Sequence, residues 1–454
     1  MELFGSSGVR GVVGEELTPA ETLRVAQAAA ATVDADRIAV ARDTRRTGEL
    51  FADAVASGLA SVGTTVDRVG IAPTPALHAY CEREGVPGVI VTASHNPAAF
   101  NGLKLVGADG VELTSDDLDR VEARLDDDPP LVAWNETGES RRVEGVRRAY
   151  REEVLGAVDR ARIADADLTV AVDPGHGAGA LTSPDLFAEL GCAVQTVNAQ
   201  PDGHFPGRDP EPVAETLGDL RRLVRATDAD LGIAHDGDAD RAMFVDETVA
   251  HIEGAAALAA LAAAELDAGD TFVSAVNVSQ RLVDVAESAG ASLELTPIGS
   301  THIITAMERL QAAGETVPIA GENNGGIFFP GYRIVRDGAY TAARFLELVA
   351  DRPASAVVAP YEAYHNVRRN IEYRSETERA AMVEAVDRAA EAARADGATV
   401  DRTDGCRLDY GDGWVLARPS GTEPLIRVYA EARDPDRAGD LAARMADRIE
   451  DARE

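Results

Sequence analysis

Short apolar runs alternate with alanine-rich amphipathic stretches over most of the chain. The runs, rich in β-branched residues and about 4–7 residues long as buried strands are, include residues 37–43, 88–93, 168–173, 231–236 and 271–277. Longer stretches with helical spacing separate them. Strands that alternate with helices predict an α/β fold, and repeated strand–helix–strand units of similar size predict three related α/β domains.

The last part of the chain has a different pattern. A helical stretch at 378–397 precedes two apolar runs joined by a turn, and a final helix places Leu441, Met445 and Ile449 on one face. This pattern predicts an α+β domain. With charged linkers taken as boundaries, we expect four domains, at residues 1–145, 146–247, 248–355 and 356–454.

Composition narrows the class of protein. The 454 residues are 45% hydrophobic, enough for several packed domains. No apolar run reaches the ~18 residues of a membrane span, and the N-terminal stretch MELFGSSGVR lacks the apolar segment of a signal peptide. The three cysteines are scattered, with neither metal nor disulfide spacing. We therefore expect a cytoplasmic protein without a membrane partner.

The charge balance is strongly acidic. Lysine and arginine number 44 against 78 acidic residues, a net charge of −34, and Lys104 is the only lysine. The acidic residues are spread along helical segments, which indicates a solvated surface of the kind halophilic proteins use. A calcium sponge or DNA mimic would favour blocks of like charge. The absence of a basic patch argues against a nucleic-acid partner.

Two loops that follow apolar runs carry candidate chemistry. Ser94 follows the run 88–93, and the carboxyl end of a buried parallel strand is where α/β proteins bind ligands. Residues 235–241 read HDGDADR, and carboxylates at Asp236, Asp238 and Asp240 suit Mg²⁺. A calcium loop would need glycine where Arg241 stands, so we exclude it. A plain turn and an acidic turn stay open as alternatives for these two loops.

Two further loops suit a phosphorylated sugar. The loop GENNGG offers the Glu322 carboxylate and the Asn324 amide to ligand hydroxyls, while its glycines permit close backbone approach. The loop RPSGTEP, which begins at Arg418 and has Arg427 beyond it, combines hydroxyls, free amide N–H groups and two arginines. Such a loop favours phosphate binding. For each loop a structural turn is the alternative.

Taken together, the motifs resemble those of the α-D-phosphohexomutase superfamily. Six carry the resemblance, in the order FGSSGVRG (4–11), TASHNP (92–97), NGLK (101–104), DGDADR (236–241), GENNGG (321–326) and RPSGTEP (418–424). The match extends over the whole chain. It implies a heart-shaped, Mg²⁺-dependent enzyme acting on a hexose phosphate, with three similar α/β domains and a fourth, TATA-binding-protein-like α+β domain.

The resemblance also implies roles for individual residues. Ser94 matches the phosphoserine, and Asp236, Asp238 and Asp240 match the ligands of one Mg²⁺ ion that phosphorylated Ser94 also helps to hold. Arg10 and Arg241 match arginines at the reaction centre, and Lys104 matches a general acid or base. The substrate-binding positions are Glu322 and Asn324 for sugar hydroxyls and, for the idle phosphate, Arg418, Ser420, Gly421, Thr422 and Arg427.

The sugar loop departs from the bacterial pattern of the superfamily, Gly-Glu-x-Ser-Gly-His. Asn324 replaces the serine and Gly326 replaces the histidine, so no histidine base can be carried over to position 326. His302 is a weak substitute, and His95 beside Ser94 has no assigned role. The Asn-Gly-Gly form looks like archaeal members assigned as phosphoglucosamine mutases, and the acidic surface indicates a haloarchaeal source.

We therefore expect a mutase that moves a phosphoryl group between Ser94 and sugar hydroxyls through a bisphosphorylated intermediate. Glucosamine-6-phosphate is the favoured substrate, while mannose, glucose and pentose phosphates stay open. A Mg²⁺-dependent phosphatase with an aspartate nucleophile is the competing enzyme class. A non-catalytic sugar-phosphate-binding protein is a further alternative, and the sequence does not indicate an oligomeric state.

Overall fold

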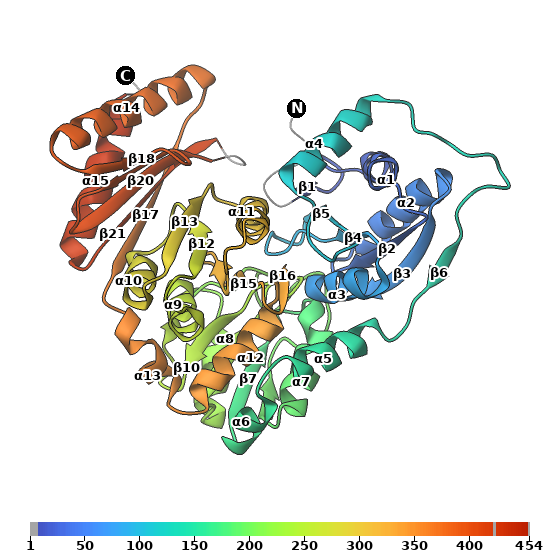
Figure 1. Cartoon of the computed structure of the whole chain (residues 1–454), viewed down its shortest axis with the longest axis horizontal. Helices are drawn as coiled ribbons and strands as arrows, with labels where there is room; N and C mark the ends of the chain where they lie inside the picture. The colour runs from blue at the N-terminus through green and yellow to red at the C-terminus, as the bar shows by residue number, and fades with distance from the viewer. Residues whose placement is uncertain (1–7, 421–423, 453–454) are drawn as a thin grey trace.

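The computed structural model describes residues 8–420 and 424–452. Four sheets follow one another along the chain, each with its own helices (Figure 1). The first three sheets contain parallel strand pairs and carry helices, whereas the fourth is antiparallel throughout. The predicted architecture of three α/β domains and one α+β domain is confirmed.

The first sheet has six strands in the order β1-β5-β4-β2-β3-β6. Its strands are β1 (Val9–Val12), β2 (Arg37–Arg42), β3 (Thr65–Ile71), β4 (Gly88–Val91), β5 (Phe100–Val106) and β6 (Ser140–Arg142). The accompanying helices are α1 (Pro19–Val33), α2 (Gly48–Ser61), α3 (Thr74–Glu84), α4 (Ser115–Ala123) and the 3₁₀ helix η1 (Arg124–Asp126). Helix α1 begins after a capping box in which Thr18 and Glu21 bond reciprocally to each other's backbone N–H.

The second sheet has the order β11-β10-β9-β7-β8. Its strands are β7 (Thr169–Asp173), β8 (Ala193–Thr196), β9 (Leu231–Ala234), β10 (Met243–Asp246) and β11 (His251–Ile252). Its helices are α5 (Val146–Gly156), α6 (Arg160–Asp165), η2 (Ala178–Leu181), α7 (Ser183–Glu189) and α8 (Gly218–Thr227). Strand β7 is parallel to β8 and β9, and β9 is buried along its whole length, as its continuous apolar run predicts.

The third sheet has the order β13-β12-β14-β15-β16. Its strands are β12 (Thr271–Ala275), β13 (Ser292–Thr296), β14 (Ala320–Gly321), β15 (Ile327–Phe329) and β16 (Arg333–Arg336). Its helices are α9 (Gly254–Glu265), α10 (Gln280–Ala289), α11 (Ser300–Ala312), α12 (Gly338–Val349), α13 (Ala354–Val358) and η3 (Ala359–Tyr361). The antiparallel pairs β14–β15 and β15–β16 bring residues 321–336 together at one edge of this sheet.

The fourth sheet has the order β17-β21-β20-β19-β18. Its strands are β17 (His365–Glu372), β18 (Thr399–Asp401), β19 (Cys406–Asp409), β20 (Gly413–Pro419) and β21 (Leu425–Ala432), and its helices are α14 (Glu376–Ala395) and α15 (Pro435–Asp451). The predicted apolar face of α15 is confirmed, because Leu441, Met445 and Ile449 are buried.

The predicted domain boundaries stay predictions, but one strand and one helix bear on where two of them should fall. Strand β11 belongs to the second sheet although it follows residue 247, and α13 spans residue 355. We therefore propose to move these two boundaries to the start of α9 and to the segment between η3 and β17.

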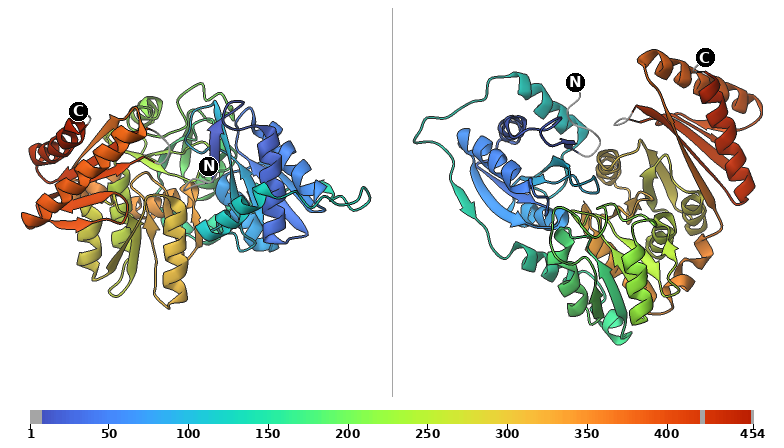
Figure 2. Two further views of the ribbon diagram at one scale, coloured as in Figure 1. Left: turned by 90° about the horizontal axis from the view of Figure 1, so that it is seen from above. Right: turned by 180° about the vertical axis from the view of Figure 1, so that it is seen from behind.

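The four domains form an arc in which the first and the fourth lie at the two ends (Figures 1 and 2). The edge of the fourth domain at which β20 ends and β21 begins faces the first domain in both the front and the back view. One cluster of buried apolar side chains includes residues of the first, second and third domains, whereas the fourth domain has a separate cluster. Among the described residues, no helix is both long and apolar enough to cross a bilayer.

Candidate active site

Ser94 lies three residues beyond Val91, the last residue of β4, at the carboxyl end of this buried strand. Its side chain is fully buried, and its Oγ donates a hydrogen bond to Asp236 Oδ2 at 2.6 Å. Its φ of 49° is in the left-handed region, which a residue with a Cβ adopts at a cost. The loop therefore holds the serine hydroxyl against a loop of the second domain in a strained backbone conformation.

Arg45 supports the Ser94 loop through hydrogen bonds to its backbone. Its guanidinium is fully buried and pairs with Asp43, with 3.0 Å between Nε and Oδ2. The two Nη atoms donate, at 2.6–3.0 Å, to the carbonyl oxygens of Ser94, Asn96, Pro97 and Phe100. Buried carbonyl groups need such partners, so Arg45 fixes the course of the whole loop.

The predicted metal loop, the Asp loop of residues 235–241, follows β9. Asp236, Asp238 and Asp240 are buried, and one carboxylate oxygen of each lies within 4.8 Å of the others. Gly237 lets this loop approach the first domain, because a Cβ there would lie 2.6 Å from the carbonyl oxygen of Ser94. Burial, and then the charges of Asp240 and Asp238, raise the pKa of Asp236 well above its ordinary value.

Arg208 supports the Asp loop as Arg45 supports the Ser94 loop. Its Nε pairs with Asp173 Oδ2 at 3.0 Å, and its Nη2 donates to the carbonyl oxygen of His235 at 2.6 Å. Asp173 ends β7, the neighbour of β9 in the sheet. A buried Arg–Asp pair therefore anchors each of the two loops that meet at Ser94.

Lys104 on β5 reaches the Asp loop. It is 2% exposed, and its Nζ donates to Asp240 Oδ2 at 2.8 Å and to Asp238 Oδ2 at 3.1 Å. Burial alone would lower the pKa of Lys104, but these two carboxylates raise it, and the net shift is upward. Thr74, at the start of α3, donates to the same Asp238 oxygen at 2.7 Å.

Two arginines complete the cationic side of the centre. Arg241 Nη2 donates to His95 Nδ1 at 2.9 Å, and Arg241 Nε lies 3.8 Å from Asp240 Oδ1. Arg241, and then burial, lower the pKa of His95, so His95 is neutral and accepts this bond. Arg10 on β1 donates from Nη1 to Asn96 Oδ1 at 3.0 Å and lies within electrostatic range of Arg241.

The Asp loop has the chemistry of a divalent-cation site. Among the described residues, Asp238 Oδ1 and Asp240 Oδ1 are buried oxygens without a hydrogen-bond partner. Unpaired buried carboxylate oxygens are costly unless a cation coordinates them. Hard oxygen donors clustered in this way fit Mg²⁺.

The sugar loop lies against the Asp loop. The backbone N–H of Ala242 donates to the Gly325 carbonyl oxygen at 3.1 Å, and a Cβ at Gly325 would lie 2.5 Å from the carbonyl oxygen of Ala242. Glu322 is 7% exposed, and Asn324 Oδ1 accepts a bond from the backbone N–H of Gly326 at 3.0 Å. The two residues predicted to bind sugar hydroxyls are thus next to the predicted metal loop.

The predicted phosphate loop belongs to the fourth domain. Arg418 on β20 and Arg427 on β21 are opposite each other in the sheet, and Arg418 Nε donates to Asp404 Oδ1 at 3.0 Å. The backbone N–H of Ser420 donates to the carbonyl oxygen of Leu425 at 2.8 Å. Gly421 and Thr422 lie outside the described residues.

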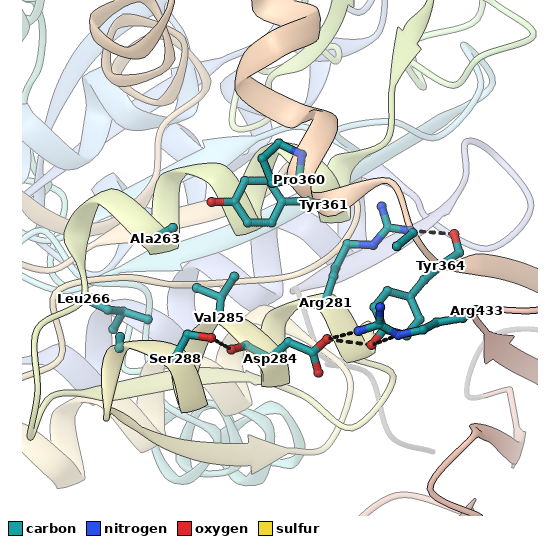
Figure 3. A pocket seen from close by; sticks show the side chains of 12 residues that line it. Ala263, Leu266, Arg281, Asp284, Val285, Ser288, Pro360, Tyr361, Tyr364 and Arg433 are labelled. Carbon is teal, nitrogen blue, oxygen red and sulfur yellow. Dashed lines mark hydrogen bonds and ion pairs between the residues drawn. The ribbon is translucent and has the colours of Figure 1, made fainter.

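Two other features lie apart from these contacts. His302 is half-buried on the first turn of α11, and its predicted role as a base stays a prediction. A cavity of about 400 Å³ lies where the third and fourth domains meet, between Tyr361, Arg281 and Arg433 (Figure 3). None of the site residues predicted from the sequence lines this cavity.

Three arginines of the site belong to none of the sequence motifs. Arg45 and Arg208 pair with Asp43, which follows β2, and with Asp173, which ends β7. An acidic residue at the end of a strand is only a weak signal, and Arg208 is 35 residues away from its partner. Arg336, at the end of β16, donates to Asp240 Oδ2 at 2.7 Å, across 96 residues of sequence. Only the fold brings this residue to the Asp loop.

Four family models match consecutive parts of the chain. They describe the phosphoglucomutase/phosphomannomutase alpha/beta/alpha domains I, II and III at residues 1–130, 148–250 and 252–364. The model of the phosphoglucomutase/phosphomannomutase C-terminal domain matches residues 372–448.

Similar proteins match over nearly the full length. A phosphoglucomutase/phosphomannomutase of Thermococcus kodakarensis is 40% identical, with 96% of each chain covered. A Methanopyrus kandleri protein named "probable phosphoglucosamine mutase" is 38% identical, with 98% of this chain and 97% of the relative covered. A crystal structure of a phosphoglucomutase/phosphomannomutase family protein from Burkholderia thailandensis has a TM-score of 0.85 and 26% identity, and the match covers 99% of this chain and 97% of that one.

Proposed function

Because the chain belongs to the phosphoglucomutase/phosphomannomutase family and is a phosphohexomutase, an isomerase, we propose that it interconverts the 6-phosphate and 1-phosphate of glucosamine through phosphorylated Ser94. The observation that carries the mechanism is the 2.6 Å hydrogen bond between Ser94 Oγ and Asp236 Oδ2. It joins a candidate nucleophile on the first domain to the carboxylate cluster of the second.

The proposed reaction transfers a phosphoryl group from one hydroxyl oxygen to another. The bond between phosphorus and Ser94 Oγ breaks, a bond between phosphorus and a sugar oxygen forms, and the sugar hydroxyl's proton is transferred, in net, to Ser94 Oγ. The bisphosphorylated sugar then turns around, and its other phosphoryl group returns to Ser94. Lys104 is the proposed carrier of the proton, because its ammonium group is buried beside the Asp loop.

The chain's own charges prepare the site for a phosphoryl group. Arg10 and Arg241 lie beside Ser94 and the Asp loop, where their N–H donors can bind phosphoryl oxygens. An alkyl phosphate is a slow phosphoryl donor, so positioning and charge neutralisation must supply most of the catalysis. The positive φ of Ser94 and the bonds from Arg45 supply the positioning.

We propose that Asp236, Asp238 and Asp240 hold one Mg²⁺ ion, with an oxygen of phosphorylated Ser94 as a further ligand. The buried oxygens of Asp238 and Asp240 that have no hydrogen-bond partner support this assignment. The ion, when bound, would neutralise charge on the phosphoryl oxygens.

The substrate contacts are divided between two domains. In the proposal, Glu322 and Asn324 bind hydroxyls that both orientations of the sugar present. The residues proposed to bind the idle phosphate are Arg418, Ser420, Gly421, Thr422 and Arg427. The choice of glucosamine is supported by the Asn-Gly-Gly form of the sugar loop and by the name of the Methanopyrus kandleri relative. The Thermococcus kodakarensis relative is named phosphoglucomutase/phosphomannomutase, so glucose and mannose phosphates stay alternative substrates.

Two measurements test the proposal. Coupled assays with the 1-phosphates of glucosamine, mannose, glucose and a pentose should give the highest kcat/KM for glucosamine. Mass spectrometry of the purified chain should find one phosphate, on Ser94. Release of inorganic phosphate without any isomer, from a chain that carries no phosphoserine, would instead support the phosphatase.

A further inference from the structure

The space above Gly326 in the sugar loop is occupied by an arginine side chain. A Cβ at position 326 would lie 2.8 Å from Arg336 Cδ and 3.1 Å from Asn324 Oδ1. The backbone of Gly326 does not have a positive φ, in contrast to Gly325 at 84°, so only this lack of space excludes a side chain. The β15–β16 hairpin causes the approach, because it pairs Phe328 with Arg336.

Arg336 joins the sugar loop to the Asp loop. It is 4% exposed, its Nη2 donates to Asp240 Oδ2 at 2.7 Å, and its Nη1 lies 3.9 Å from Glu322 Oε2. The second distance is too long for a hydrogen bond. Within residues 8–420 and 424–452, Asp240 is the one hydrogen-bond partner of this guanidinium. A guanidinium has five N–H donors, so a buried cation here keeps donors for a ligand.

The charge of Arg336 is fixed, because a guanidinium is not deprotonated in proteins. The side chain therefore exchanges no proton. A fixed planar cation between a phosphoryl site and a sugar site is suited to oxygens that carry negative charge.

We propose that Arg336 is a catalytic residue that binds the phosphoryl group in transit between Ser94 and the sugar hydroxyl, and that Gly326 is a glycine because a side chain would displace this arginine. The inference rests on the proposed function. Arg336 stabilises charge on the non-bridging phosphoryl oxygens, while the proton passes between the two hydroxyl oxygens as described above. The third domain thereby contributes to the chemistry as well as to sugar recognition.

Replacement of the arginine gives the first test. Loss of one preorganised donor typically lowers kcat about 100- to 1000-fold. We expect Arg336→Gln to show a loss of this size, with KM for the sugar 1-phosphate changed less than about fivefold and Mg²⁺ affinity retained in calorimetric titrations of the full chain. Arg309→Gln, which breaks an exposed ion pair with Glu294 in the same domain, is the control and should keep full activity.

Replacement of the glycine gives the second test and leaves the arginine in place. Gly326→Ala should lower kcat by about 10- to 100-fold, since ~1 Å of displacement can have an effect of this order. Gly331→Ala is the matched control, because a Cβ at Gly331 in the same hairpin would meet no atom within 4 Å. A rise in KM with unchanged kcat would mean that the alanine acts through Asn324, and the proposal would fail.

The outcomes separate the inference from the proposed function. Suppose that the wild-type chain isomerises a sugar phosphate and that kcat of Arg336→Gln stays within about threefold of the wild-type value. This change is smaller than the loss of one such donor causes, so Arg336 would not touch the phosphoryl group. If kcat and Mg²⁺ affinity fall together, Arg336 only supports Asp240, which also overturns the inference. If the wild-type chain isomerises none of the four sugars, the proposed function itself is wrong.

Discussion

The proposed reaction centre and the proposed C-terminal phosphate loop are built in different ways. At the proposed reaction centre, loops and strands of three domains meet through side chains that are almost fully buried, such as Ser94, Lys104 and Arg336. One cluster of buried apolar side chains, which includes residues from Ala39 to Val358, connects these three domains. The phosphate loop belongs to a domain with a separate core, and its Arg418 is 15% exposed and paired with Asp404.

The fourth domain joins the third through a small set of polar and apolar contacts. Glu431 Oε1 accepts a hydrogen bond from the backbone N–H of Gln280 at 2.6 Å, at the start of α10. Arg407 Nη1 donates to the carbonyl oxygens of Val276 and Val278. Trp414 adds a small apolar cluster with Val276. These contacts attach the sheet that carries Arg418 without extending the shared core into it.

The difference matches the role proposed for each region. Phosphoryl transfer needs its donors and carboxylates held in place before the substrate arrives, and a continuous core provides that rigidity. An idle phosphate only has to be bound, at whichever end of the sugar it occurs. We therefore expect changes at the reaction centre to affect kcat, and changes in the fourth domain to affect KM.

Removal of the Ser94 hydroxyl should have the largest effect. We expect Ser94→Ala to lower kcat more than about 1000-fold, as the loss of a nucleophile does, with an unchanged melting temperature. Steady-state kinetics and thermal melting measure the two quantities. Ser288→Ala, at an exposed position on α10, is the control. Retention of more than a few per cent of activity would refute the nucleophile assignment.

The paired arginines under the two loops should come next. Lysine keeps the charge of Arg45 but cannot reach four carbonyl oxygens at once, so Arg45→Lys should let the Ser94 loop shift. We expect kcat to fall about 100-fold with little change in KM, and Arg208→Lys to behave alike through the Asp loop. Kinetics of Arg68→Lys, which alters an exposed ion pair with Asp53, give the reference. A change confined to KM would contradict the assigned role.

These arginines also show which contacts could not be predicted from the sequence. The strands and the loops that follow them could be predicted, because apolar runs and turn residues are local features of the chain. Lys104 and the Asp loop could be assigned to one centre only through the family resemblance. Arg45 was not predicted, because its partners lie as far as Phe100 in the chain, and the fold alone brings Arg336 to Asp240. Contacts between distant segments depend on the packing of whole sheets.

Arg418 tests the other side of the comparison. Hydrogen bonds to a charged group contribute about 2 kcal/mol, or roughly 30-fold in affinity. Arg418→Ala should therefore raise KM for the sugar phosphate by this order and change kcat less than about threefold. The control is Arg402→Ala, since Arg402 pairs with Asp387 on the exposed face of the same domain. A larger effect on kcat than on KM would mean that the fourth domain takes part in the chemistry.

The smallest effect should come from the junction itself. Arg433 Nη2 donates to Asp284 Oδ2 at 2.9 Å, and its Nε donates to the Tyr364 hydroxyl at 3.0 Å, at the rim of the interdomain cavity in Figure 3. The arginine side chain is 65% exposed, so solvent and salt weaken this ion pair. We expect Arg433→Ala to change KM by less than about fivefold and to leave kcat unchanged.

The salt dependence of KM tells whether this contact orients the phosphate loop. If it does, the difference in KM between Arg433→Ala and the wild type should shrink as salt rises, because salt already screens the pair in the wild type. Arg437→Ala is the matched control, since Arg437 pairs with Asp412 at the surface of the same domain, away from the cavity. A loss of kcat in Arg433→Ala alone would show that the junction reaches the reaction centre, and the two regions would then not be independent.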